Sequence, residues 1–225
     1  MAEGKLVGVS VGPGDPELLT LKALRALRQA EVIAYPCTEQ GTSTALDIVA
    51  EHVADKPQLK CLMPMTRDKG VLAQAHAQAA DAICKRLARG LDVAYLCLGD
   101  VSVYASFGYL RDEVGRRGYQ TESIPGVTSL CAAAARLQQP LCEDDGRLLV
   151  ASARDEDLTE VLDFPATKVL MKPGRSLKAL RDALESRGSL DTARTMTRCG
   201  YADERVHEGV PEDATGYFSL IIVDE

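Results

Sequence analysis

Three glycine-containing segments of this sequence carry residue types suited to holding a ligand. They are Gly12–Pro16 (GPGDP), Gly99-Asp100 within LGDVSVY, and Pro125–Ser129 (PGVTS). A glycine lets a ligand approach the backbone closely, because no Cβ stands in the way. Asp100 adds one charged hydrogen-bond acceptor. These types favour the binding of a small molecule, although the same residues would also serve in ordinary turns, with Asp100 capping a helix.

The apolar run Val93–Leu98, bounded by Gly90 and Gly99, precedes the second segment. A short continuous apolar run is typical of a strand that is buried on both faces of a parallel sheet. A helical pattern follows from about Tyr104. Ligands of open α/β sheets bind beyond the carboxyl ends of the strands. The sequence therefore predicts that Gly99 and Asp100 lie at the ligand-binding edge of a sheet.

The first segment lies inside a predicted βαβ unit. Lys5–Val11 is its first strand, a leucine-rich amphipathic helix follows the turn, and Glu31–Tyr35 is its second strand. The turn lacks the GxGxxG dinucleotide fingerprint, and no G-K-[ST] follows it. This turn is therefore interpreted as one wall of a pocket of another kind, or as a plain tight turn.

The rest of the chain predicts two α/β domains, residues 1–120 and 121–225, with their boundary between about Gly118 and Gly126. Further helices are expected at Thr42–Val53, Val71–Arg89, Tyr104–Gly118, Asp157–Leu162 and Leu177–Arg187, and further strands at Leu59–Met63, Gln120–Ile124, Arg147–Ala151, Lys168–Met171, Thr192–Arg198, Arg205–Glu208 and Tyr217–Val223. The last strands leave little room for helices between them, which predicts a mixed second sheet beside a mainly parallel first one.

Composition limits the classes of function. The net charge of −7 disfavours a nucleic-acid partner, because phosphate binding needs a basic face. No apolar run approaches the length of a membrane span, and the first residues, MAEGK, lack a signal-peptide core. Seven scattered cysteines without a CxxC pair indicate neither a disulfide framework nor a zinc site. We expect a cytoplasmic protein, in a reducing compartment.

The order and spacing of the three segments resemble the tetrapyrrole (corrin/porphyrin) methyltransferase family, which uses S-adenosylmethionine. The opening GVSVGPGDPELLTLKA, the pair LGD and VYAS, and IPGVTS match its signatures. PMTRD, VLMKP, RCGYADE and the closing YFSLIIV are most similar to the branch that methylates carbon 20 of precorrin-2 or of its cobalt-containing counterpart. The resemblance covers nearly the whole chain.

The resemblance implies a two-domain tetrapyrrole methylase fold with the active site in the cleft between the domains, and a homodimer. Residue-by-residue matching implies that the methyl donor contacts Pro13, Leu98, Gly99, Asp100, Val103, Thr128 and Ser129 of the first half, and Met171, Cys199 and Gly200 of the second. Each of these also has an ordinary structural interpretation, as core, cap or turn. One departure is Val101, where the family usually has proline after Gly-Asp.

Methyl transfer from a sulfonium to an electron-rich carbon is a direct displacement, so we expect no protein-bound metal and no covalent nucleophile. We assign no catalytic base. A polyanionic tetrapyrrole needs local cations in this acidic protein, and Arg67 and Arg175 follow predicted strands. Arginine binds carboxylates in a bidentate manner, although a solvated surface arginine fits either position equally. Tyr104 completes the predicted substrate-binding set.

Alternative functions remain at this point. The same fold could methylate uroporphyrinogen III or another precorrin, or it could direct the donor to RNA or protein. A non-catalytic nucleotide-binding module is the alternative from a different class. The motifs fit metal-free precorrin-2 and cobalt-sirohydrochlorin (cobalt-factor II) equally.

Overall fold

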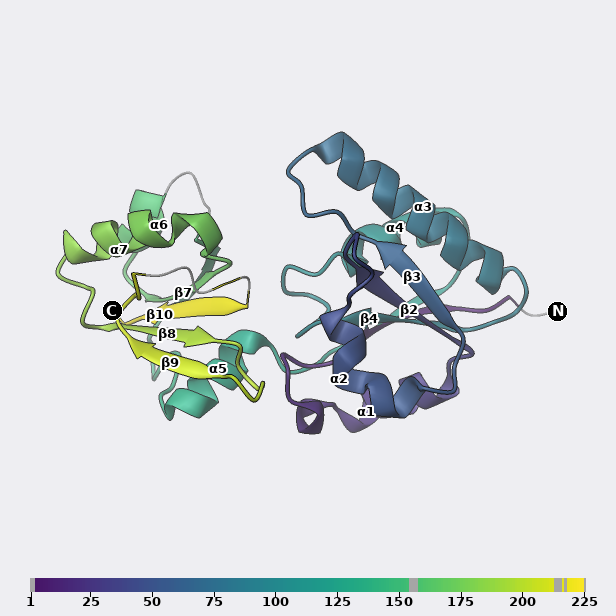
Figure 1. Ribbon diagram of the computed structural model, residues 1–225, viewed down its shortest axis with the longest axis horizontal. Coiled ribbons are helices and arrows are strands. Elements are labelled where there is room, and N and C mark those ends of the chain that lie inside the picture. The colour runs from purple at the N-terminus through teal and green to yellow at the C-terminus, as the bar shows by residue number, and fades with distance from the viewer. Residues whose placement is uncertain (1–2, 154–157, 213–215, 217, 225) are drawn as a thin grey trace. The chain divides into compact units, whose positions relative to one another are not determined.

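The computed structural model describes residues 3–153, 158–212, 216 and 218–224, and it divides into two compact units, Met1–Thr128 and Ser129–Glu225 (Figure 1). We call them the N-terminal and C-terminal units. The division falls after Thr128 rather than after residue 120. The reason is that β5 (Thr121–Ile124) pairs in parallel with β1 (Leu6–Ser10), which ties this strand to the N-terminal unit.

The N-terminal unit contains a five-stranded sheet in the order β3-β2-β4-β1-β5. All four pairings are parallel, as the sequence predicted. The remaining strands are β2 (Val32–Cys37), β3 (Gln58–Leu62) and β4 (Val93–Cys97). Ser10 lies opposite Cys97 and Val9 lies opposite Ile124, so the carboxyl ends of β4, β1 and β5 are neighbours. This register places the three glycine-containing segments at one edge of the sheet.

Helices cover both faces of this sheet, which explains its continuous apolar runs (Figure 1). On one face are η1 (Pro16–Leu18), α1 (Leu21–Gln29) and α2 (Thr44–Val53), and on the other are α3 (Lys69–Leu87) and α4 (Phe107–Arg116). The helix predicted from Tyr104 begins instead at Phe107. The Phe107 ring lies 2.5 Å from where a Cβ on Gly8 would stand, so β1 needs a glycine there.

The C-terminal unit contains a mixed sheet in the order β6-β7-β10-β8-β9, which confirms the predicted mixed pairing. Its strands are β6 (Leu148–Ser152), β7 (Thr167–Met171), β8 (Ala193–Thr197), β9 (Arg205–Glu208) and β10 (Ser219–Val223), and its helices are α5 (Ser129–Leu137), α6 (Leu158–Asp163), η2 (Gly174–Ser176) and α7 (Leu177–Glu185). The predicted first residues of α6 and β10, Asp157 and Tyr217, lie outside the described residues.

The strand β10 is central and fully buried. Its apolar sequence is therefore explained by the core, where Ile221 packs with Leu170 and Leu180. The strand offers no apolar surface for a subunit interface. Within the described part of the chain, no helix has the length and apolar character that a membrane span requires.

Candidate active site

The first two glycine-containing segments lie side by side beyond the ends of β1 and β4. The Gly99 N–H donates to the Gly12 carbonyl at 2.7 Å, and the Gly12 N–H donates to the Gly99 carbonyl at 3.2 Å. Gly12 has a φ of 77° and Gly99 a φ of 69°, a region that favours glycine. Pro13 is buried beside them. These two hydrogen bonds hold the first two segments against one another.

Ser10, the last residue of β1, joins the third segment to the other two. Its hydroxyl donates to the Ile124 carbonyl at 2.7 Å and accepts from the Val101 N–H at 2.8 Å, and the residue is 1% exposed. A Cβ on Gly126 would lie 2.5 Å from the Ser10 Cβ, so the segments approach this closely only because residue 126 is glycine. Sequence reasoning missed Ser10; its only signal was a polar residue at the end of an apolar strand.

Asp100 is buried, with 6% of its surface exposed, and its carboxylate binds its own loop and the loop after β5. Oδ2 accepts from the Gly126 N–H at 2.7 Å, while Oδ1 accepts from the Ser102 N–H at 2.8 Å and from the Ser102 hydroxyl. Burial by itself raises the pKa of this carboxyl, but the hydrogen bonds from Ser102 and Gly126 outweigh it and lower the pKa. Asp100 is therefore an ionised link between loops, and direct contact with a methyl donor stays a prediction.

This lowered pKa predicts an acid-dependent loss of stability. A carboxylate whose pKa is lower in the folded state contributes stability that is complete above the unfolded pKa and lost as the pH falls through the folded pKa. The difference in unfolding free energy between wild type and Asp100→Asn should therefore shrink as the pH falls below about 4. Urea denaturation at a series of pH values measures this difference. A difference that stays constant down to the acid limit of folding would contradict the assignment.

The remaining predicted donor residues that follow β4 and β5, together with the predicted substrate-binding residue Tyr104, flank these links. Leu98 is partly buried against the core under α1 and α2, and the Val103 N–H donates to the Asp100 carbonyl at 3.3 Å. Tyr104 is half exposed and has a φ of 50°, which is unusual for a side chain of this size. Thr128 and Ser129 are partly buried, at the end of this unit and at the start of α5. All follow the carboxyl ends of β4 and β5.

The C-terminal unit brings three of its four predicted donor residues, all except Ser129, to one edge of its own sheet. Met171 ends β7, and Cys199 and Gly200 follow β8, on either side of the start of β10. Leu220 lies opposite Met171 and Ser219 opposite Thr197.

Two non-glycine residues at this edge have a left-handed backbone. Lys172 has a φ of 58° and Arg198 of 50°. Strained residues persist only where their surroundings hold them, and they gather at functional sites. The geometry therefore agrees with a binding role for this edge.

Of the two arginines predicted to bind the substrate, the structure describes the side chain of Arg67 but not that of Arg175. Arg67 is exposed in the loop between β3 and α3, and among the described residues it has no hydrogen bond or ion pair. Its neighbour Asp68 caps α3 by accepting from the Gly70 N–H at 2.8 Å. The backbone of Arg175 lies in η2, but its side chain lies outside the described part. The substrate-binding roles of both stay predictions.

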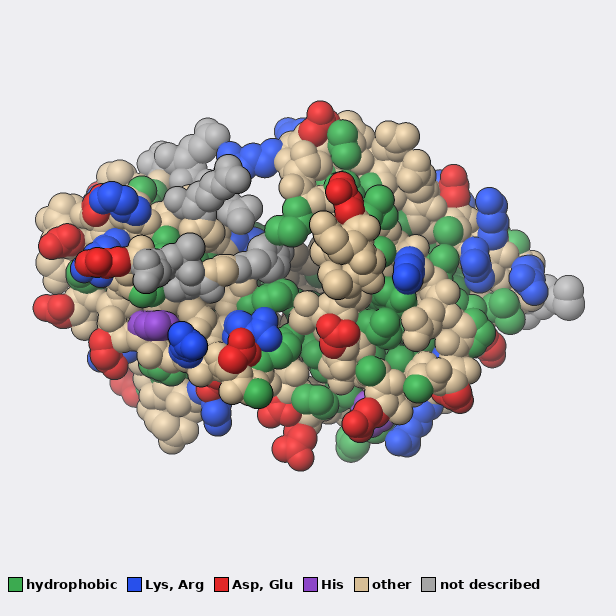
Figure 2. Space-filling view, in the orientation of Figure 1, with side chains coloured by type: hydrophobic (Ala, Val, Ile, Leu, Met, Phe, Trp, Pro, Cys, Tyr) green, Lys and Arg blue, Asp and Glu red, His purple; other side chains and the backbone are tan. Residues whose placement is uncertain are grey.

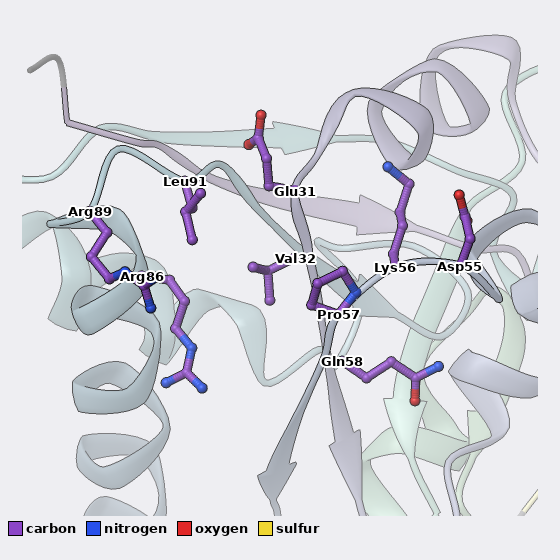
Figure 3. A pocket seen from close by; sticks show the side chains of 9 residues that line it. All are labelled: Glu31, Val32, Asp55, Lys56, Pro57, Gln58, Arg86, Arg89 and Leu91. Atoms are coloured by element: carbon purple, nitrogen blue, oxygen red, sulfur yellow. The ribbon is translucent and has the colours of Figure 1, made fainter.

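A cavity of about 600 Å³ lies at the opposite, amino edge of the N-terminal sheet (Figure 3). It is lined by Glu31, Val32, Asp55, Lys56, Pro57, Gln58, Arg86, Arg89 and Leu91. The Lys56 ammonium donates to the Arg28 carbonyl at the end of α1 and to the Ala30 carbonyl just after it, at 2.9 and 2.7 Å, and Arg86 donates to the Ala82 carbonyl at 2.9 Å. Both cations therefore hold local structure. Since ligands of such sheets bind at the carboxyl edge, we do not assign this cavity to the active site.

Comparison with known proteins relates the chain to one family. The family described as Tetrapyrrole (Corrin/Porphyrin) Methylases matches residues 5–215. The chain is 34% identical to the precorrin-2 C(20)-methyltransferase of Sinorhizobium sp., over 98% of this chain and 95% of that protein. It is 36% identical to the cobalamin biosynthesis protein CobIJ of Mycobacterium tuberculosis, over 99% of this chain, but it spans only 46% of that longer protein.

A solved structure supports the same fold. The cobalt precorrin-4 methyltransferase CbiF superposes with a TM-score of 0.78 at 24% identity, over 98% of this chain and 94% of that one. This likeness shows that the chain shares the fold of that methyltransferase.

Proposed function

Since this chain belongs to the tetrapyrrole (corrin/porphyrin) methylase family, we propose that it transfers a methyl group from S-adenosylmethionine to carbon 20 of precorrin-2 or cobalt-sirohydrochlorin in cobalamin biosynthesis. The observation that carries this proposal is the identity of 34% to a precorrin-2 C(20)-methyltransferase along nearly the full length of both chains. The convergence of the three glycine-containing segments supports it, because this edge is where the fold class binds ligands.

The residues of both edges fit a nucleoside-containing donor. Leu98, Val103 and Met171 are partly buried and offer apolar surface to an adenine ring. Thr128 and Ser129 add hydroxyl groups, which suit the polar parts of such a molecule. We propose that these residues, with Pro13, Gly99, Asp100, Cys199 and Gly200, contact the donor.

The proposed chemistry is a single displacement. The donor supplies the methyl group and its own leaving group: the nucleophilic carbon of the macrocycle forms the new C–C bond while the bond from methyl carbon to sulfur breaks toward sulfur. The protein's own contribution is alignment, which is worth a large part of the barrier in bimolecular reactions. The buried strand ends hold the loops that orient the donor. Carbon 20 afterwards loses a proton, and we assign no residue as its acceptor.

An absorbance titration tests whether the protein is a tetrapyrrole methylase at all. Addition of S-adenosylmethionine to protein and precorrin-2 under anaerobic conditions should change the macrocycle spectrum, and S-adenosylhomocysteine should bind by calorimetry. A protein that binds the nucleotide without any spectral change would instead be the non-catalytic module. A spectral change with uroporphyrinogen III but not with precorrin-2 would instead indicate that the protein methylates uroporphyrinogen III.

Recognition of the macrocycle should depend on local cations, and Arg67 is the first candidate because it is exposed at a strand end and has no protein partner among the described residues. Arg67→Ala should weaken tetrapyrrole binding by roughly 1.5–3 kcal/mol, the value of a charged hydrogen bond, and should leave the affinity for S-adenosylhomocysteine unchanged. Fluorescence quenching and calorimetry measure the two affinities.

Arg25→Ala is the matched control for that variant, because Arg25 is an exposed arginine on α1, away from the strand ends. If both affinities fall in Arg67→Ala, the residue supports the fold or the donor site. If neither falls, Arg67 does not bind the macrocycle.

We also propose a cytoplasmic homodimer. Cytoplasmic location rests on the seven cysteines scattered along the sequence without a CxxC pair, a pattern that suits a reducing compartment. Dimerisation rests on family analogy, and exposed hydrophobic side chains of the N-terminal unit, such as Leu62, Met65, Val71 and Tyr109, are compatible with it. Figure 2 shows further hydrophobic side chains on the surface of this unit. Sedimentation at micromolar concentration should give twice the chain mass of 24.2 kDa; a monomer would contradict the proposal.

A further inference from the structure

The loop between β8 and β9, Arg198–Glu204 (RCGYADE), carries two acidic residues with different surroundings (Figure 1). Asp203 lies on the outside, where its carboxylate accepts from Arg198 Nε at 2.6 Å. The Asp203 side chain is 59% exposed and the Arg198 side chain 40%. The Arg198 guanidinium also stacks on the Tyr201 ring at 4.5 Å. An exposed pair of this kind contributes little to stability.

Glu204 instead turns its carboxylate into the loop. Oε2 accepts from the Gly200 N–H at 2.7 Å, and Oε1 accepts from Arg136 Nε of α5 at 2.8 Å. The side chain is only 14% exposed. Burial alone would raise the pKa of this carboxyl, but the Gly200 N–H, Arg136 and the Cys199 thiol together lower it. The carboxylate thus holds Cys199-Gly200 in place through charge-assisted hydrogen bonds, the stronger kind.

We propose that Glu204 is a positioning residue of the donor site, an inference that rests on the proposed function, in which Cys199 and Gly200 contact the donor. Arg198, on one side of Cys199, has a positive φ of 50°, and such strain in a non-glycine residue persists only where the surroundings hold it. Without the Glu204 carboxylate, the Gly200 N–H loses its partner and the segment can relax. Donor binding must then reorder it, which reduces affinity.

The test compares Glu204→Ala, Glu204→Gln and Arg136→Ala. Asp163→Ala is the matched control, because it removes an Arg187 Nε–carboxylate pair of the same 2.8 Å length, between the end of α6 and the segment after α7. Glu204→Ala should weaken S-adenosylhomocysteine binding about tenfold or more and raise the KM for S-adenosylmethionine in proportion, with little change in kcat. Glu204→Gln should recover part of the affinity because it keeps one oxygen acceptor, and Arg136→Ala should cost less than Glu204→Ala.

Two binding results would overturn the proposal. One is Glu204→Ala binding as tightly as Asp163→Ala. The other is a loss of S-adenosylhomocysteine affinity in Arg136→Ala as large as the loss in Glu204→Ala. That result would assign the role to the ion pair and not to the hydrogen bond with Gly200.

Hydrogen exchange of the ligand-free protein separates this inference from the proposed function. Peptides that contain Gly200 should exchange faster in Glu204→Ala than in wild type and in Asp163→Ala. Unchanged exchange would overturn the inference even if the wild type binds the donor. A wild type that binds no S-adenosylhomocysteine would overturn the proposed function instead, while the exchange result would still decide whether Glu204 holds the loop.

Discussion

Replacing Asp100 by alanine should nearly abolish binding of S-adenosylhomocysteine. The carboxylate accepts hydrogen bonds from the Ser102 and Gly126 N–H groups, at 2.8 and 2.7 Å, and so fixes the loops after β4 and β5 to one another. A hydrogen bond to a charged group is worth about 1.5–3 kcal/mol. Losing two of them corresponds to roughly a hundredfold loss of affinity or more if the bound state requires this loop geometry.

Calorimetry with S-adenosylhomocysteine measures this loss, and circular dichroism confirms that the variant is folded. Asp68→Ala is the matched control, because Asp68 also accepts two backbone N–H bonds, from Gly70 and Val71, but in an exposed helix cap. The control should lose some stability, about 1 kcal/mol, and no donor affinity. Undiminished affinity in a folded Asp100→Ala protein would remove Asp100 from the donor site.

Gly126→Ala should have the second large effect. An added Cβ would lie 2.5 Å from the Ser10 Cβ and 3.1 Å from the Gly99 carbonyl oxygen, so one of the three loops must move. Overpacking of this kind costs about 1–3 kcal/mol of stability. Because the loop after β5 must shift away from Ser10, donor affinity should fall together with stability.

Gly108→Ala is the control that isolates the clash. It makes the same chemical change in the same unit, within α4, and the added Cβ would meet nothing within 4 Å. Alanine favours helix, so this variant should be as stable as wild type or slightly more stable. Urea denaturation and calorimetry measure both properties. A Gly126→Ala protein that matches Gly108→Ala in both would contradict the close approach of the three loops.

The sheets could be predicted because burial determines their strand sequences. Val93–Cys97 is fully buried between two helical layers, so an apolar run was required, and the parallel order then placed Gly12, Gly99 and Gly126 at one edge. The unit boundary was harder to predict, because β5 belongs to the N-terminal sheet through its pairing with β1. That pairing joins residues far apart in the chain and leaves no local pattern.

The side-chain links of the site could not be predicted. The sequence identified Asp100 as an acid at a strand end, but the direction of its carboxylate depends on Gly126, which is 26 residues away. Ser10 bonds to Ile124 across 114 residues, and Glu204 bonds to Arg136 across 68. Short-range spacing contains no signal for such pairs, whereas the family resemblance pointed to the backbone segments that they hold.

The most direct test of the central claim is product analysis after an anaerobic reaction with S-adenosylmethionine that carries a carbon-13 methyl group. Precorrin-2 and cobalt-sirohydrochlorin are offered separately, and the product is examined by mass spectrometry and NMR. We predict that at least one of them gains a single labelled methyl group, attached to carbon 20. A label at any other position, or no label in either macrocycle while S-adenosylhomocysteine still binds, would contradict the proposed function.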